Sequence, residues 1–146
     1  MRILSCLSIA AVATLLACSK VGAAEDPQPA PPSGTKPKIT IKTAPSIPPG
    51  EGSTDDIEGT VTGVKGSDYK VVIYAYGDKW YVQPTVAAPL TDIDEEGKWE
   101  AKTHGGLEYA ALLVKPSYKP SATLETLPKA GGDVIAVAKK KPKKED

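Results

Sequence analysis

Phenylalanine is absent from this chain of 146 residues, and histidine occurs once, as His104. An apolar core therefore has to be built from Val, Ile, Leu, Tyr and Trp. A zinc site takes three or four Cys, His or carboxylate ligands, which one His and two Cys cannot supply without several carboxylates. His104 precedes Gly105-Gly106, so we expect an exposed histidine in a turn. No Ser lies in a Gly-x-Ser-x-Gly elbow, and the sequence predicts neither an enzyme nor a cofactor.

The chain also lacks an excess of charge of either sign, with 18 basic and 18 acidic residues. Nucleic-acid-binding domains usually carry a basic face, so we expect no nucleic acid partner. Segments with a sustained helical period are missing as well. The 14 Pro and 13 Gly favour turns and irregular segments over long helices.

What the chain does have at its start is an apolar stretch, residues 3–17, behind a short positive beginning. This stretch is too short to span a bilayer comfortably and is typical of a secretory signal peptide. It ends in Leu15-Leu16-Ala17-Cys18, which resembles the lipobox of bacterial lipoproteins. The resemblance implies cleavage after residue 17, lipidation of Cys18 and a lipid anchor in a membrane of the bacterial cell envelope.

The two cysteines agree with that interpretation. Cys6 lies inside the predicted signal peptide, residues 1–17, so Cys18 is the one cysteine of the expected mature chain and no internal disulfide is possible. A terminus with several acyl chains is a stable anchor, whereas a single chain binds membranes only marginally. Residue 19 is Ser and not Asp, which resembles the lipoproteins directed to an outer membrane where the organism has one.

A proline-rich segment follows the predicted anchor. Eight of the 14 prolines lie between residues 20 and 52, and proline-rich chain is extended and semi-rigid. We therefore expect a disordered tether over residues 18–52. Within it, residues 38–42 alternate polar and apolar side chains, which predicts a short strand. This strand is either the first strand of the domain, which we favour, or a free edge.

Residues 69–84 are the densest apolar and aromatic part of the chain after its start. They predict two strands, 69–76 and 80–83, joined by a turn at Gly77-Asp78. Turn signals every 8–12 residues separate further short strands and favour an all-β sandwich over residues 53–139, with a small barrel as the alternative. A charged tail, residues 140–146, is expected to follow. The other expected elements are strands at 57–64, 90–93, 98–102, 108–115 and 133–139, and one helical turn at 124–127.

Several of these segments resemble the immunoglobulin-like or fibronectin-like accessory modules of secreted bacterial carbohydrate-active enzymes. The resemblance implies an immunoglobulin-like β-sandwich of about seven strands with a non-catalytic, carbohydrate-binding role, and it places Tyr109 at a tyrosine corner. Unlike those modules, this one stands behind a lipid anchor with no enzyme in the same chain. Docking on another envelope protein therefore remains the alternative function. The resemblance is carried by residues 57–64, 68–74, 78–84 and 108–113 and by Gly97-x-Trp99.

Aromatic side chains are the candidate binding residues, because the apolar C–H faces of sugars stack on exposed aromatic rings. Trp80 and Tyr81 point to opposite faces of one expected strand, so one of them is free to be exposed. Tyr74 and Tyr76 share a face of the neighbouring strand. The alternative is core packing, since Tyr and Trp are usually largely buried, and for Trp99 we expect the core.

Two charged runs complete the sequence. Asp92-x-Asp94-x-Glu96-Gly97 has the oxygen ligands and the glycine of the first half of a calcium loop. Thr103 stands where the closing carboxylate is needed, so we expect an acidic turn and no metal. The lysine-rich residues 139–144 are expected to be a solvated tail, with contact to an anionic surface as the alternative.

Overall fold

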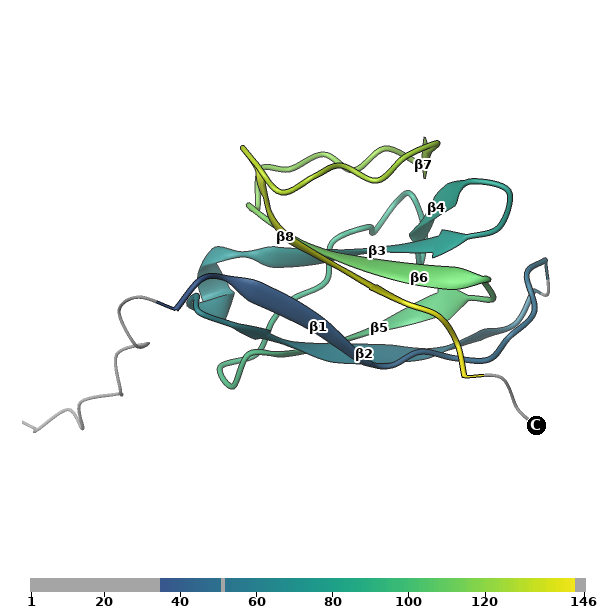
Figure 1. Ribbon diagram of the computed structural model, residues 1–146, viewed down its shortest axis with the longest axis horizontal. Helices are drawn as coiled ribbons and strands as arrows, with labels where there is room; N and C mark the ends of the chain where they lie inside the picture. The colour runs from purple at the N-terminus through teal and green to yellow at the C-terminus, as the bar shows by residue number, and fades with distance from the viewer. Residues whose placement is uncertain (1–34, 51, 144–146) are drawn as a thin grey trace, which may run out of the picture.

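The computed structural model describes residues 35–50 and 52–143 and folds them into two antiparallel sheets (Figure 1). The prediction of an all-β sandwich is confirmed. Cys18, the signal peptide and most of the predicted tether lie outside the described residues. The sheet of three strands has the order β1 (Lys38–Thr43), β2 (Thr54–Thr62), β5 (Lys98–His104). The sheet of five has the order β7 (Thr123–Leu124), β4 (Trp80–Gln83), β3 (Lys70–Tyr76), β6 (Glu108–Val114), β8 (Val134–Lys140).

The chain crosses from one sheet to the other three times along its length. The first, second and fifth strands share one sheet, and the third pairs with the sixth on the other. Tyr109, near the start of β6, is fully buried, and its hydroxyl accepts a hydrogen bond of 3.0 Å from the Gly106 N–H. The predicted tyrosine corner is therefore present. Within the described ranges, no helix has the length and apolar character that a membrane span requires.

Strand β1 belongs to the sandwich. Ile39 and Ile41 are buried, while Lys38, which precedes them, and Thr40, which lies between them, are exposed. This alternation turns the two isoleucines toward the other sheet. The sandwich therefore begins at Lys38, inside the range expected to be tether.

The strands run between two ends of the sandwich, one marked by Lys38 and the other by His104. Lys38 of β1 pairs with Thr62 at one end. Thr54, at the start of β2, pairs with His104 at the other end. The nine residues of β2 thus extend over the length of the three-stranded sheet, and the chain enters the domain at the end remote from His104.

Both faces of the central strands β3 and β6 are buried. One face packs against the three-stranded sheet and forms what we call the inner core. The opposite face forms the outer core, which is covered by the chain between β6 and β8. The inner core comprises Ile39, Ile41, Ile57, Val61, Val71, Ile73, Ala75, Ile93, Trp99, Tyr109, Ala111 and Leu113. The outer core comprises Val72, Tyr74, Trp80, Val82, Ala110, Leu112, Val114, Leu127 and Val134.

Three local predictions differ from the structure. Residues 124–127 do not form a helical turn, because Thr123 and Leu124 pair with β4 as strand β7. Residues 90–93 contain a single bridge, from Thr91 to Val71, in place of a strand. The last strand, β8, continues to Lys140, where its pairing with Tyr109 keeps the first lysines of the predicted tail in the sheet.

Candidate ligand-binding groove

A groove of about 760 Å³ lies at the end of the sandwich where β3 ends, β4 begins and β5 ends. Its wall on one side is the loop before β2, which comes very close to Gly105. A Cβ atom on Gly105 would stand 2.1 Å from the Pro48 carbonyl oxygen. Only glycine therefore allows this loop to close onto the β5–β6 turn. The groove is lined by residues of five separate segments, among them Pro49, Tyr81, Pro84, Val86, His104 and Leu107.

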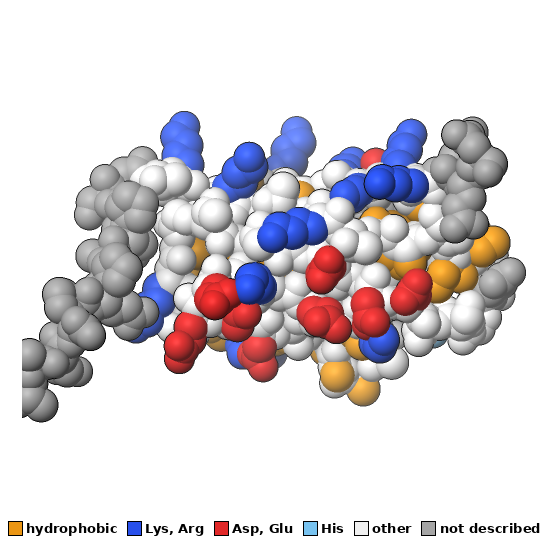
Figure 2. All heavy atoms as spheres, turned by 90° about the horizontal axis from the view of Figure 1, so that it is seen from below, with side chains coloured by type: hydrophobic (Ala, Val, Ile, Leu, Met, Phe, Trp, Pro, Cys, Tyr) orange, Lys and Arg blue, Asp and Glu red, His pale blue; other side chains and the backbone are white. Residues whose placement is uncertain are grey.

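The large hydrophobic side chains that are exposed within the described residues gather at this groove. Tyr81 is 39% exposed, Leu107 57% and Val86 64%, and all three line it. Figure 2 shows hydrophobic side chains toward this end of the sandwich and mixed acidic and basic side chains over the three-stranded sheet. Sequence reasoning did not identify Val86 and Leu107. Both lie in turns, where no alternating pattern distinguishes buried from exposed residues. The sequence feature that could have pointed to them is an apolar residue next to turn-forming residues.

Tyr81 is the predicted binding residue that faces the groove. Its hydroxyl donates a 2.7 Å hydrogen bond to the Asp78 carboxylate in the β3–β4 turn. This hydrogen bond raises the pKa of Tyr81 and lowers the pKa of Asp78. The turn itself is closed by the Gly77 N–H, which donates to the Lys79 carbonyl at 3.0 Å. This bond ties the phenol hydroxyl to the β3–β4 turn, and Tyr81 lines the groove.

Gln83 and His104 form the polar corner of the groove. The Gln83 side chain is buried, and its Oε1 accepts hydrogen bonds from the His104 backbone N–H at 3.0 Å and from His104 Nδ1 at 2.9 Å. His104 is half-buried and pairs with Thr54 at the end of β5. The expectation of an exposed turn histidine is therefore wrong, because β5 extends two residues beyond the predicted strand and brings His104 against the other sheet.

The other predicted aromatic residues lie on the opposite face of the five-stranded sheet. Tyr74 is fully buried and Trp80 is 5% exposed, both in the outer core. Tyr76 is half-buried, with its ring centroid 5.0 Å from that of Trp80. Lys139 Nζ lies 5.5 Å from the centroid of the Trp80 ring. Tyr81 alone of these four residues lines the groove, and the four do not form a continuous exposed strip.

The acidic run before β5 forms a turn, as predicted. The Asp94 carboxylate accepts hydrogen bonds from the backbone N–H groups of Glu96 at 2.9 Å and Lys98 at 2.7 Å. Gly97 completes the turn with a φ of 78°, in the left-handed region that favours glycine. This carboxylate serves the turn itself. Among the described residues, no group of three His, Cys, Asp or Glu side chains has a metal-binding arrangement.

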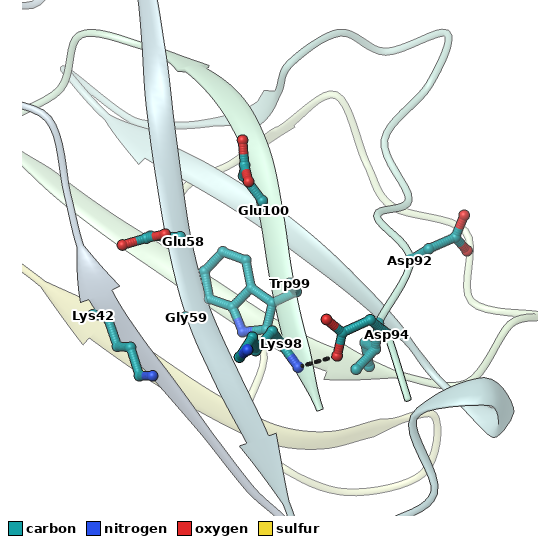
Figure 3. A pocket seen from close by; sticks show the side chains of 9 residues that line it. Lys42, Glu58, Gly59, Asp92, Asp94, Lys98, Trp99 and Glu100 are labelled. Atoms are coloured by element: carbon teal, nitrogen blue, oxygen red, sulfur yellow. Dashed lines mark hydrogen bonds between the residues drawn. The ribbon is translucent and has the colours of Figure 1, made fainter. Parts of the chain in front are cut away.

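A second hollow, of about 580 Å³, lies next to this turn (Figure 3). Trp99 lines it and packs so closely on β2 that a Cβ atom on Gly59 would stand 2.4 Å from the indole ring. Trp99 is 2% exposed, as expected for a core residue, and its Nε1 has no hydrogen-bond partner among the described residues. Charged groups of both signs surround the hollow, including Lys42 and Glu58. The indole of Trp99 is almost inaccessible here, whereas Tyr81 is 39% exposed, so the groove at Tyr81 is the better candidate site.

No protein-family model, no curated protein and no solved structure matches this chain. The fold and the groove are therefore the basis for a functional conclusion.

Proposed function

We propose that this protein is a non-catalytic binding module of the bacterial cell envelope, which holds a carbohydrate chain in the groove at Tyr81. The observation that carries the proposal is the partly exposed Tyr81 ring, fixed by its hydrogen bond to Asp78. A ring that is already oriented loses little conformational freedom when a ligand stacks on it. We further propose that lipid on Cys18 anchors the module to a membrane, the outer membrane where the organism has one.

The mixture of groups in the groove supports a carbohydrate ligand. A sugar has apolar C–H faces and many hydroxyl groups, so a site for it needs an aromatic face together with hydrogen-bonding side chains. Tyr81 supplies the face, and Asp78 and His104 supply polar atoms that line the same groove, while the buried Gln83 holds His104. Ligand sites generally combine apolar walls with a few placed polar groups in this way.

The binding test uses the mature chain, residues 18–146, with Cys18→Ser so that it stays free of lipid. With its groove residues unchanged, this protein should be retained by at least one of cellulose, xylan, chitin and peptidoglycan. Tyr81→Ala should weaken retention about tenfold, which corresponds to about 1.4 kcal/mol of binding free energy, with little change in Tm. Tyr81→Phe is the matched comparison, because it keeps the ring and removes only the bond to Asp78, so it should weaken retention less than Tyr81→Ala does. If no polysaccharide retains the wild-type protein, the carbohydrate role is wrong.

Docking on another envelope protein is the second candidate function. The exposure of Val86 and Leu107 beside Tyr81 favours it, because apolar contacts in the centre of an interface carry much of its binding energy. In this case Leu107→Asp would abolish cross-linking to the partner in intact cells. Polysaccharide retention by purified protein separates the two functions, since docking requires none.

The anchor is tested by mass spectrometry of the protein isolated from bacterial membranes. The mature protein should begin at Cys18 and carry the mass of acyl chains, and Cys18→Ala should leave an unlipidated precursor. Unmodified Cys18 in the mature protein would contradict the proposed localisation.

A further inference from the structure

The hydrogen bonds of Gln83 determine which nitrogen of His104 carries a proton. The His104 backbone N–H is only a donor, so the Gln83 side-chain atom 3.0 Å from it has to be the amide oxygen. The Gln83 amide nitrogen then faces the Tyr81 carbonyl at 3.3 Å, as its donor character requires. The orientation of this buried amide follows from its neighbours on both sides.

The same oxygen lies 2.9 Å from Nδ1 of His104. An amide oxygen only accepts hydrogen bonds, so Nδ1 has to carry the hydrogen. A neutral imidazole has one N–H, and its other nitrogen is an acceptor. The contact with Gln83 therefore selects the Nδ1–H tautomer of His104 and leaves a lone pair on Nε2. In general, the hydrogen bond made by one imidazole nitrogen sets the protonation of the other nitrogen.

The lone pair on Nε2 is available to a ligand. His104 is half-buried and lines the groove, and none of the hydrogen bonds of the described residues involves Nε2. Gln83 occupies the Nδ1 edge of the ring on its buried side. The groove that Tyr81 lines thus also contains an acceptor, Nε2 of His104. It is an acceptor because the buried Gln83 keeps the ring hydrogen on Nδ1.

We propose that Nε2 of His104 accepts a hydrogen bond from a hydroxyl group of the bound carbohydrate and makes His104 a specificity-determining residue of the groove. This inference rests on the proposed carbohydrate function. Tyr81 would bind any sugar ring with an apolar face, whereas His104 selects rings that present a hydroxyl donor beside that face. A site built to pair with a hydroxyl discriminates strongly against ligands that lack it, because its own polar group is then left unpaired.

The tautomer is tested first, without any ligand. Long-range ¹⁵N–¹H correlation spectra of ¹⁵N-labelled residues 18–146, with Cys18→Ser, should show His104 in the Nδ1–H form at neutral pH. Gln83→Leu should remove this preference, because the acceptor at Nδ1 is gone. A free protein with the Nε2–H form would overturn the inference even if the protein binds polysaccharide.

The binding role is tested with two substitutions that each keep one nitrogen position. His104→Asn keeps a donor near Nδ1, where it can bond Gln83, and loses the acceptor at Nε2. His104→Gln places an amide oxygen near the position of Nε2 and loses the side-chain bond to Gln83, while the backbone N–H of residue 104 still donates to it. Affinities for cellohexaose, xylohexaose and chitohexaose are measured with Tm on the same samples. We expect His104→Asn to weaken the best of the three about tenfold with Tm unchanged, and His104→Gln to stay within about threefold while Tm falls.

The outcomes separate this inference from the proposed function. If His104→Asn binds as wild type while Tyr81→Ala is weakened, the groove binds carbohydrate and the inference about His104 is wrong. The same conclusion follows if His104→Gln loses binding and His104→Asn does not, since His104 would then act only through Gln83. If the wild-type protein binds none of the oligosaccharides and no polysaccharide, the proposed function fails and the inference fails with it.

Discussion

The central strands β3 and β6 of the five-stranded sheet are buried on both faces, but the two faces are covered in different ways. The inner core lies against the regular strands β1, β2 and β5. The outer core lies under irregular chain, with Leu127 buried in it and Tyr118 and Leu124 partly buried against it. A covering sheet is held by a ladder of backbone hydrogen bonds, whereas a covering loop needs separate contacts to stay in place.

Within the described residues, the covering loop is held by the two-residue pairing of β7 with β4 and by a few single contacts. Tyr74 Oη donates to the Ser121 carbonyl at 3.0 Å, and the Val82 N–H donates to the Ala122 carbonyl at 3.0 Å. At the far end of the loop, the Lys115 N–H donates to the Asp133 carbonyl at 3.0 Å. A segment held by a few contacts opens locally at lower free energy than a paired strand. The comparison therefore teaches that equal burial does not imply equal rigidity.

The largest expected effect is in the inner core. Ile73 is fully buried between the two sheets, where regular pairing on both sides hinders collapse of a cavity. Ile73→Ala should lower the free energy of unfolding by about 4 kcal/mol, within the usual range of about 2–5 kcal/mol. Urea denaturation measures it. A cost near zero would mean that the inner core does not hold the two sheets together.

The corresponding change in the outer core should cost less. Leu127 is 9% exposed and belongs to the covering loop, so the loop can move inward when its side chain is shortened. Leu127→Ala should cost about 2 kcal/mol, near the lower end of the range for such substitutions. The difference from Ile73→Ala measures how much the cover relaxes. Equal costs for the two variants would contradict the contrast between the faces.

Alkaline pH should destabilise the protein through its buried tyrosines. Burial raises the pKa of Tyr74, Tyr109 and Tyr118 above the ordinary value. A raised pKa in the folded state leaves stability intact below the unfolded pKa of about 10 and lowers it as pH rises further. Tyr74 and Tyr109, which are fully buried, each contribute up to about 1.4 kcal/mol per pH unit, and the partly buried Tyr118 contributes less. Denaturation at pH 8 to 11 should show this loss, and Tyr74→Phe should make it less steep.

The smallest effect concerns one hydrogen bond of the cover. Tyr74→Phe keeps the buried ring and removes the bond to Ser121, so at pH 8 it should cost about 1 kcal/mol. Hydrogen exchange should increase at the Val82 N–H, which donates to the adjacent Ala122. Exchange at Ala111, in the middle of β6, should change only with the global stability. Uniform faster exchange at both sites would show that the cover does not open separately.

Sequence patterns predicted the strands that have one buried face and one exposed face, because polar and apolar residues alternate along them. Ile57 and Val61 are buried and alternate with the exposed Glu58, and β4 has the predicted bounds. Strands β3 and β6 were found as apolar runs, yet their pattern does not tell what covers the second face. A loop that covers a core needs only scattered apolar residues, such as Tyr118 and Leu127, and these show no period.

The candidate site was predicted only in part. Tyr81 was one of four proposed aromatic residues, and alternation correctly put it on the face opposite Trp80. The groove around it depends on loops that lie far apart in the sequence, such as those of Pro49 and Leu107. The role proposed for His104 depends on its bonds to Gln83, which connect the two sheets. Neither the meeting of these loops nor the contact between Gln83 and His104 leaves a local sequence pattern, so neither could be predicted from the sequence.

The entry of the chain at Lys38 sets how far the groove can search for a ligand. The groove lies at the other end of the sandwich, about 30 Å away by the rise of the nine residues of β2. The 20 residues from Cys18 to Lys38 can extend by at most about 70 Å. If Cys18 carries the proposed lipid, these two lengths together limit the distance between the membrane and the groove to at most about 100 Å, so a polymer has to come within that distance to be captured.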